Sequence, residues 1–219
     1  MTKFGLVAFV LLLAPAVFGS VPWMRRREST AAGVAANERL SALAGGLLYV
    51  LLLALCVTIL EVQSALPAHF LVGFILVPPL ALKLGSAGYR FARYYTGNRA
   101  YRQAGPPPLV LRVTAPVLVA STLIAFGSGF ELWLYGLALG DAWISIHNLS
   151  SVVMLLSGSV HLVGHLRRSA AVAGDEVGRV ATGRRDALPW LVVASLGLGI
   201  ALALASLLYA SPFPKTFGG

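Results

Sequence analysis

Three of the four histidines in the chain lie within one apolar stretch, residues 142–166, which holds no Lys, Arg, Asp or Glu. They are His147, His161 and His165. An imidazole is costly to place among lipid tails and normally has a partner inside a helical bundle. The side-chain chemistry of the chain is therefore expected to centre on this stretch.

The spacing of two of these histidines favours metal ligation. His147 and His161 are fourteen residues apart, so on an α-helix the second ring returns to within roughly 40° of the first, about 21 Å further along the axis. Both imidazoles then point into the same side of the bundle, near opposite membrane surfaces. This spacing resembles that of the haem-carrying helix of b-type membrane cytochromes, and the resemblance implies that these histidines ligate haem iron. For each ring taken alone, the alternative is a hydrogen-bonded interior histidine.

The amino-acid composition indicates which kind of structure positions these histidines. Of 219 residues, 58% are hydrophobic and 11% are charged, against about a quarter charged in soluble domains. The prediction is an all-α integral membrane bundle that contacts lipid. The single Cys56 provides neither a disulfide framework nor a cysteine metal site. The net charge of +9 is carried beside the apolar spans, so it does not indicate nucleic-acid binding.

Apolar runs predict six transmembrane helices. The first run could instead be a cleaved signal peptide, but Arg25, Arg26 and Arg27 follow it at once and favour a retained helix. Pro67 is expected in the first turn of the third span, and Pro78 and Pro79 are expected to kink that helix. Asp186 is expected to be the N-cap of the sixth span. The predicted spans are residues 4–21, 40–60, 67–95, 110–136, 142–166 and 187–210.

The distribution of basic residues predicts the orientation. Segments 25–39, 90–112 and 167–185 hold fourteen of the seventeen Lys and Arg residues, and in a six-span topology all three lie on one side. Basic loops stay in the cytoplasm. We therefore expect a multi-pass protein of the inner (cytoplasmic) membrane with its N-terminus outside.

A third histidine is expected at the depth of His147. His69 lies a few residues below the outer end of the third span, as His147 does in the fifth. Two facing imidazoles at one depth are what bis-histidine ligation of haem iron requires. Gly127 and Gly129 of the fourth span lie there too, and they would either admit a flat porphyrin or allow close helix packing.

The stretch AHFLVGFILVPPLALK, with the His147–His161 helix, resembles the bacterial cytochrome b561 family and the related cytochrome b subunits of formate dehydrogenases and nickel-iron hydrogenases. The resemblance implies a four-helix core with two haems b, in residues 40–168, between an N-terminal helix and connector (1–39) and a cytoplasmic connector with a last helix (169–219). It places His69, Gly73 and Lys83 on the family's His, Gly and basic positions.

One departure from the family concerns the inner haem. Its second histidine should come from the second span, where none occurs and Gly45 and Gly46 stand near that depth. Haem ligation by His69 and His147 is therefore better supported than a second haem at His161. Three inner sites stay open: ligation by His161 with Lys83, a five-coordinate haem on His161, or no haem, with His161 bonded to a neighbour such as Ser157 and space for a quinone.

Lys83 has three alternative roles. It could snorkel toward the membrane surface, which is usual for a lone membrane lysine, neutralise a haem propionate or ligate iron. Glu61 and Glu131 could relay protons to a quinone. The alternative, which we expect, is that both are solvated residues at helix ends.

Together these patterns predict an electron-transfer subunit rather than a stand-alone enzyme. It would pass electrons through haem between a quinone pool and a redox partner protein, the cofactor carrying the redox change. The alternative is a haem-free membrane scaffold or transporter component whose histidines bind a metal or line a proton path.

Overall fold

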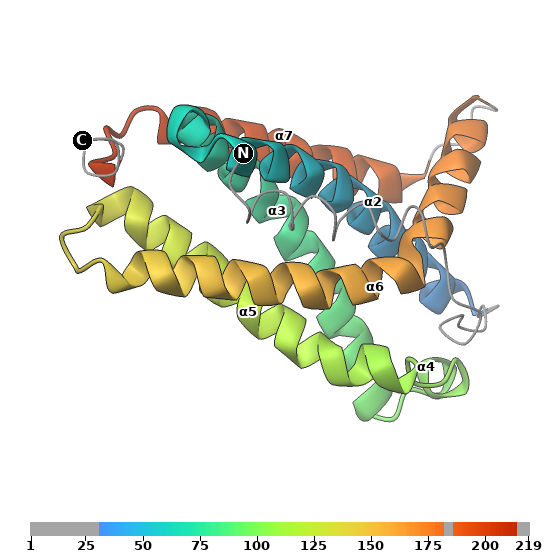
Figure 1. The fold of residues 1–219 in the computed structure, drawn as a ribbon. Coiled ribbons are helices and arrows are strands. Elements are labelled where there is room, and N and C mark those ends of the chain that lie inside the picture. The colour runs from blue at the N-terminus through green and yellow to red at the C-terminus, as the bar shows by residue number, and fades with distance from the viewer. Residues whose placement is uncertain (1–30, 182–185, 214–219) are drawn as a thin grey trace.

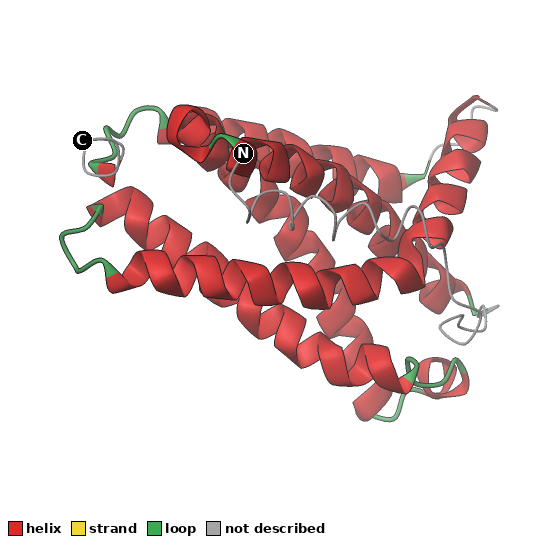
Figure 2. Cartoon of the chain, viewed as in Figure 1, coloured by secondary structure: helices red, strands yellow, loops and turns green. Residues whose placement is uncertain are grey.

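The computed structural model describes residues 31–181 and 186–213 of the chain (Figure 1). All regular structure within these ranges is helical, as predicted (Figure 2). The first predicted span, residues 4–21, lies outside the described residues. The helices are α2 (Ala32–Leu60), α3 (Val62–Tyr95), α4 (Arg99–Gln103), α5 (Leu109–Tyr135), α6 (Ala142–Ala181) and α7 (Ala187–Ser206).

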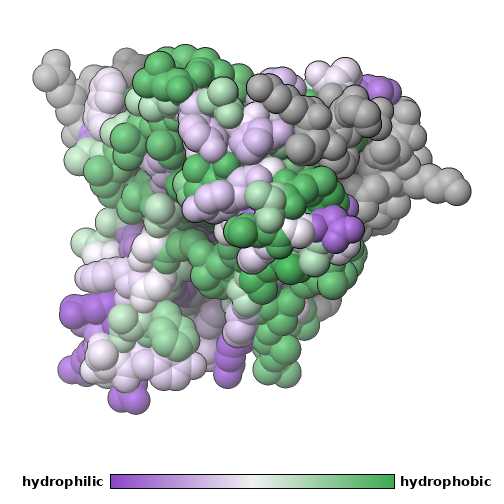
Figure 3. Space-filling view, turned by 90° about the vertical axis from the view of Figure 1, so that its left-hand side faces the viewer, coloured by the Kyte–Doolittle hydropathy of each residue, from purple (hydrophilic) through white to green (hydrophobic). Residues whose placement is uncertain are grey.

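Five of these helices are long and apolar enough to cross a membrane: α2, α3, α5, the first part of α6 (Ala142–Val163) and α7. Large apolar side chains are exposed along them, and Figure 3 shows hydrophobic residues over much of one face, with the main group of hydrophilic residues at its lower left. An apolar exterior of this size suits lipid rather than water. The chain is therefore a multi-pass helical membrane protein.

The bundle has two distinct ends. α5 and α6 form an antiparallel pair, and α3 packs against α2 and α7 (Figure 1). We call the end with the α2–α3 junction and the α5–α6 connection the His69 end. The opposite end, with the starts of α2 and α7 and with α4, is the Arg39 end. The helix directions thus bring the described parts of the three basic segments to one end, as the charge pattern requires.

Two helices extend beyond their predicted bounds at the Arg39 end. α2 begins at Ala32 rather than at residue 40, and α6 continues to Ala181 through a stretch predicted to be a connector. Both extensions contain residues that form helices readily. Their charged residues, such as Glu38 and Glu176, are buried against other helices rather than marking loops.

α3 runs without interruption through Pro78 and Pro79. Pro79 has no N–H, so the carbonyl of Ile75, four residues earlier, lacks its helical donor. Gly199 of α7 lies directly against that carbonyl, where a Cβ would overlap its oxygen. A glycine Cα–H can make a weak contact to the carbonyl oxygen, so this approach joins α7 to α3.

The sequence correctly predicted one helix start and misplaced another. Asp186 caps α7, because its carboxylate accepts a hydrogen bond from the Leu188 N–H at 3.1 Å. α3, in contrast, begins at Val62, so Pro67 lies beyond the first turn where it was expected. The missing N–H of Pro67 is tolerated there, although it removes one bond of the helix.

Candidate functional site

His69 of α3 and His147 of α6 lie side by side at the His69 end of the bundle. Their ring centroids are 6.3 Å apart and the ring planes are nearly perpendicular, at 86°. The two side chains come from different helices and are separated by 78 residues of sequence. The structure thus brings together the two histidines that the depth comparison paired.

α5 holds His147 in place. Its Nδ1 lies 2.9 Å from the Ala125 carbonyl oxygen and 3.3 Å from the Ser128 hydroxyl. A Cβ on Gly129 would come within 3.0 Å of the imidazole Cε1. The ring therefore occupies the space that a side chain at Gly129 would fill. A histidine that donates Nδ1–H to a carbonyl keeps a lone pair on Nε2, the usual arrangement for a metal ligand.

α2 holds His69 in a similar way. Its Nδ1 lies 2.9 Å from the Thr58 hydroxyl, and that hydroxyl donates to the Leu55 carbonyl at 2.5 Å. Because the hydroxyl hydrogen is used in that bond, Thr58 accepts from His69 Nδ1–H. Nε2 of His69 is then also the nitrogen with the lone pair.

The separation of the rings fits a shared metal ion. Two metal–imidazole bonds of about 2 Å, with about 1.1 Å from each nitrogen to its ring centre, place two ring centres about 6 Å apart. The observed 6.3 Å matches that requirement. The Nδ1 contacts of both rings supply the outer hydrogen bonds that such ligands usually have. If haem iron bound at this end of the bundle, His69 and His147 would be the residues to hold it.

The three glycines predicted near the haem differ in their surroundings. Among the described residues, no atom lies within 4 Å of a Cβ built at Gly73 or Gly127. Gly73 lies on α3 one turn from His69, and a Cβ there would meet open space. Gly127 is exposed on the outside of α5. Gly127 therefore lies away from His147, whereas Gly129 lies against its ring.

His161 lies further along α6 and is held by its own helix. Its Nδ1 is 3.1 Å from the Ser157 carbonyl oxygen and 3.5 Å from the Thr114 hydroxyl of α5. The contact with Ser157 agrees with the alternative in which His161 is bonded to that neighbour. His165, one turn further, is exposed.

Lys83 does not snorkel. Its amine is buried between α3 and α2, where Nζ donates to the Ser41 carbonyl at 2.6 Å and to the Ser41 hydroxyl at 2.7 Å. A Cβ on Gly45 would lie 3.3 Å from this nitrogen. Gly45 thus leaves room for the lysine amine.

The two glutamates of the His69 end differ in exposure. Glu61 is exposed, as expected for a helix end. Glu131 on α5 is 9% exposed, and neither carboxylate oxygen has a hydrogen-bond partner among the residues that the structure describes. The expectation that Glu131 is a solvated helix end is therefore wrong.

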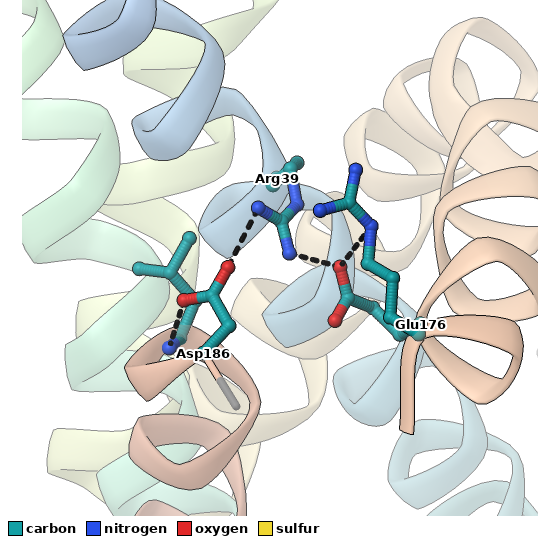
Figure 4. Close-up of polar contacts among 5 residues, drawn as sticks. Arg39, Glu176 and Asp186 are labelled. Carbon is teal, nitrogen blue, oxygen red and sulfur yellow. Dashed lines mark hydrogen bonds and ion pairs between the residues drawn. The ribbon is translucent and has the colours of Figure 1, made fainter. Parts of the chain in front are cut away.

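At the Arg39 end, one arginine bridges two carboxylates (Figure 4). Arg39 of α2 pairs with Glu176 of α6 and donates to Asp186 at 2.8 Å. A second pair joins α2 to α3, with Arg90 3.5 Å from Glu38. The sequence did not reveal these pairs, because Glu38 and Arg39 were interpreted as a connector. The sequence signal that could have revealed them is a helical pattern that continues through Glu38 and Arg39.

Sequence reasoning also missed the polar residues that orient the two histidines. Thr58 and Ser128 are buried hydroxyl-bearing side chains within the membrane-spanning parts of α2 and α5, and a hydroxyl in such a stretch was the signal that could have identified them. Within residues 31–181 and 186–213, no three His, Cys, Asp or Glu side chains come together as a metal site.

Comparisons with known proteins add no assignment. No protein-family model matches the sequence. Searches of curated proteins and of solved structures also find no match.

Proposed function

We propose that this chain is a membrane b-type cytochrome that passes electrons between a quinone pool and a redox partner protein. The observation that carries the proposal is the His69–His147 pair, with ring centroids 6.3 Å apart and Nδ1 of each ring already engaged. Haem b supplies the one-electron chemistry when bound. The chain supplies two imidazole ligands, their orientation and a low-dielectric surrounding.

The direct test is a reduced-minus-oxidised absorption spectrum of the purified full-length protein. We expect b-type bands of a low-spin haem. His69→Ala and His147→Ala should each abolish the same bands, because each removes one of two axial ligands. His165→Ala is the matched control, since His165 lies exposed on the same helix as His147. Absence of b-type bands in the wild-type protein would refute the proposal.

The proposal includes an orientation in the cytoplasmic membrane, with the Arg39 end in the cytoplasm and the N-terminus outside. Ser169 is a poor labelling site because it is buried against α2. Gln103 and Leu139 are exposed at opposite ends of the bundle. In a Cys56→Ser background, an impermeant thiol reagent added to intact cells should label cysteine at position 139 and spare position 103. The reverse pattern would invert the topology.

A further inference from the structure

We infer that Glu131 is a proton-binding site coupled to the redox state of the His69–His147 centre. This inference rests on the proposed function and names a residue that takes up a proton when an electron arrives. It begins from the buried carboxylate of Glu131, whose two oxygens have no hydrogen-bond partner among the described residues. A buried polar group in that state calls for an explanation.

The position of Glu131 links it to the histidines. Ser128 contacts His147 Nδ1 at 3.3 Å, and Glu131 lies three residues further along α5. Residues three apart on a helix are neighbours, with Cβ atoms about 5–6 Å apart. Glu131 therefore stands one helical turn from the residue that touches His147. It is also four residues before the last residue of α5, so a proton from the aqueous side has a short way to travel.

The surroundings of Glu131 disfavour a permanent negative charge. The carboxylate is withdrawn from water, and it lies toward the C-terminal end of α5, where the helix dipole is negative. Its charged form needs a nearby positive charge, which an oxidised metal centre held by His69 and His147 provides. The titratable groups described at this end, on the elements around Glu131, are Cys56, Glu61, His69, Tyr135, Asp141, His147 and Tyr209. No lysine or arginine is among them.

The coupling follows from charge balance. Entry of one electron lowers the net charge of the centre by one. Uptake of one proton by the Glu131 carboxylate, giving the neutral acid, restores it. Because this linkage is reciprocal, the protonated acid also favours the reduced centre. The electron comes from a quinol or, in an experiment, from an electrode, and the proton comes from water.

The experiment is a spectroelectrochemical titration of the full-length protein from about pH 5 to about pH 9. One proton per electron makes the midpoint potential fall by about 59 mV for each tenfold drop in proton concentration. We expect such a slope over part of this range in the wild type and a flat, higher midpoint in Glu131→Gln. Asp141→Asn is the matched control, because Asp141 is an exposed carboxylate at the same end, and it should keep the slope.

A second readout follows the carboxyl group itself. The reduced-minus-oxidised infrared spectrum should show a carboxylic acid carbonyl band that appears on reduction, is lost in Glu131→Gln and changes frequency in Glu131→Asp. The Asp variant serves if Glu131→Gln fails to assemble, since it keeps the carboxyl group.

The outcomes separate this inference from the proposed function. A slope that persists in Glu131→Gln, an infrared band unchanged in Glu131→Asp, or b-type bands whose midpoint is flat with pH in the wild type would overturn the inference alone. A protein without b-type bands would overturn the proposed function and the inference with it.

Discussion

Arg39 on α2 donates a hydrogen bond to Asp186, the N-cap of α7, across 147 residues of sequence, and the same guanidinium also binds Glu176 on α6 (Figure 4). Three helices thus meet at one side chain. Because Glu176 is buried, removing the arginine leaves its carboxylate without its strongest partner.

Arg39→Ala should therefore destabilise the bundle by about 1.5–3 kcal/mol, the usual range for a hydrogen bond to a charged group. Unfolding in a detergent titration measures this change. Arg179→Ala is the control, because Arg179 is more exposed and lies 3.8 Å from Glu176. If both variants lose equal stability, the bridge by Arg39 is not what joins the helices.

The same contacts predict a dependence of stability on pH. The hydrogen bond from the Leu188 N–H, and then that from Arg39, lower the pKa of Asp186 below its usual 3.8. A carboxyl whose pKa is lower in the folded state stabilises the fold above its unfolded pKa, and that contribution is lost as the pH falls through the folded value.

Between pH 7 and pH 5, Asp186 should therefore contribute a constant amount, and its contribution should decline only below about pH 4. Comparing the melting temperatures of the wild type and Asp186→Asn across this range measures the effect. The difference should be constant near neutrality and shrink in acid. A difference that grows in acid would contradict the assigned contacts.

Gly129 provides a steric test of the histidine site. A methyl group there would come within 3.0 Å of His147 Cε1. Gly129→Ala should displace the ring at a cost of about 1–3 kcal/mol, typical of overpacking, and convert much of the low-spin haem to a high-spin form or lose it. Gly127→Ala adds the same methyl group to an exposed face of α5 and should leave the spectrum unchanged. Equal effects of the two substitutions would mean that His147 is not the ligand.

The second histidine of α6 predicts the haem content. α2 has no histidine that could complete a site with His161, and the Lys83 amine is bonded to Ser41, so we expect one haem per chain. Haem quantitation against protein should give a ratio near one that His161→Ala does not change. A ratio near two would contradict the prediction and would favour a second haem on His161.

The sequence predicted the elements whose signals are local. Unbroken apolar runs located the described spans, and relative depth paired His69 with His147, because helix rise converts residue number into distance along the membrane normal. The capping role of Asp186 was likewise local.

Other features depended on contacts between helices and could not be read from one segment. Glu38 and Arg39 lie in a stretch that is typical of a connector by sequence. Their ion-pair partners are on α3 and α6, so the pairs are visible only in the folded structure. Lys83 resembled a snorkelling side chain because nothing in its own helix shows that Ser41 faces it. Glu131 was placed at a solvated end, since its burial depends on how other elements pack around α5.

The approach of Gly199 to Ile75 has a consequence for the order in which the membrane bundle is completed. The Ile75 carbonyl is deprived of its helical donor by Pro79, and the surface of α7 covers it. During synthesis α3 enters the membrane well before α7, so for that interval this oxygen faces lipid or the insertion machinery. An unsatisfied carbonyl in hydrocarbon is costly. Docking of α7 removes that cost, which gives the last described helix a part in maturation of the bundle and not only in its final packing.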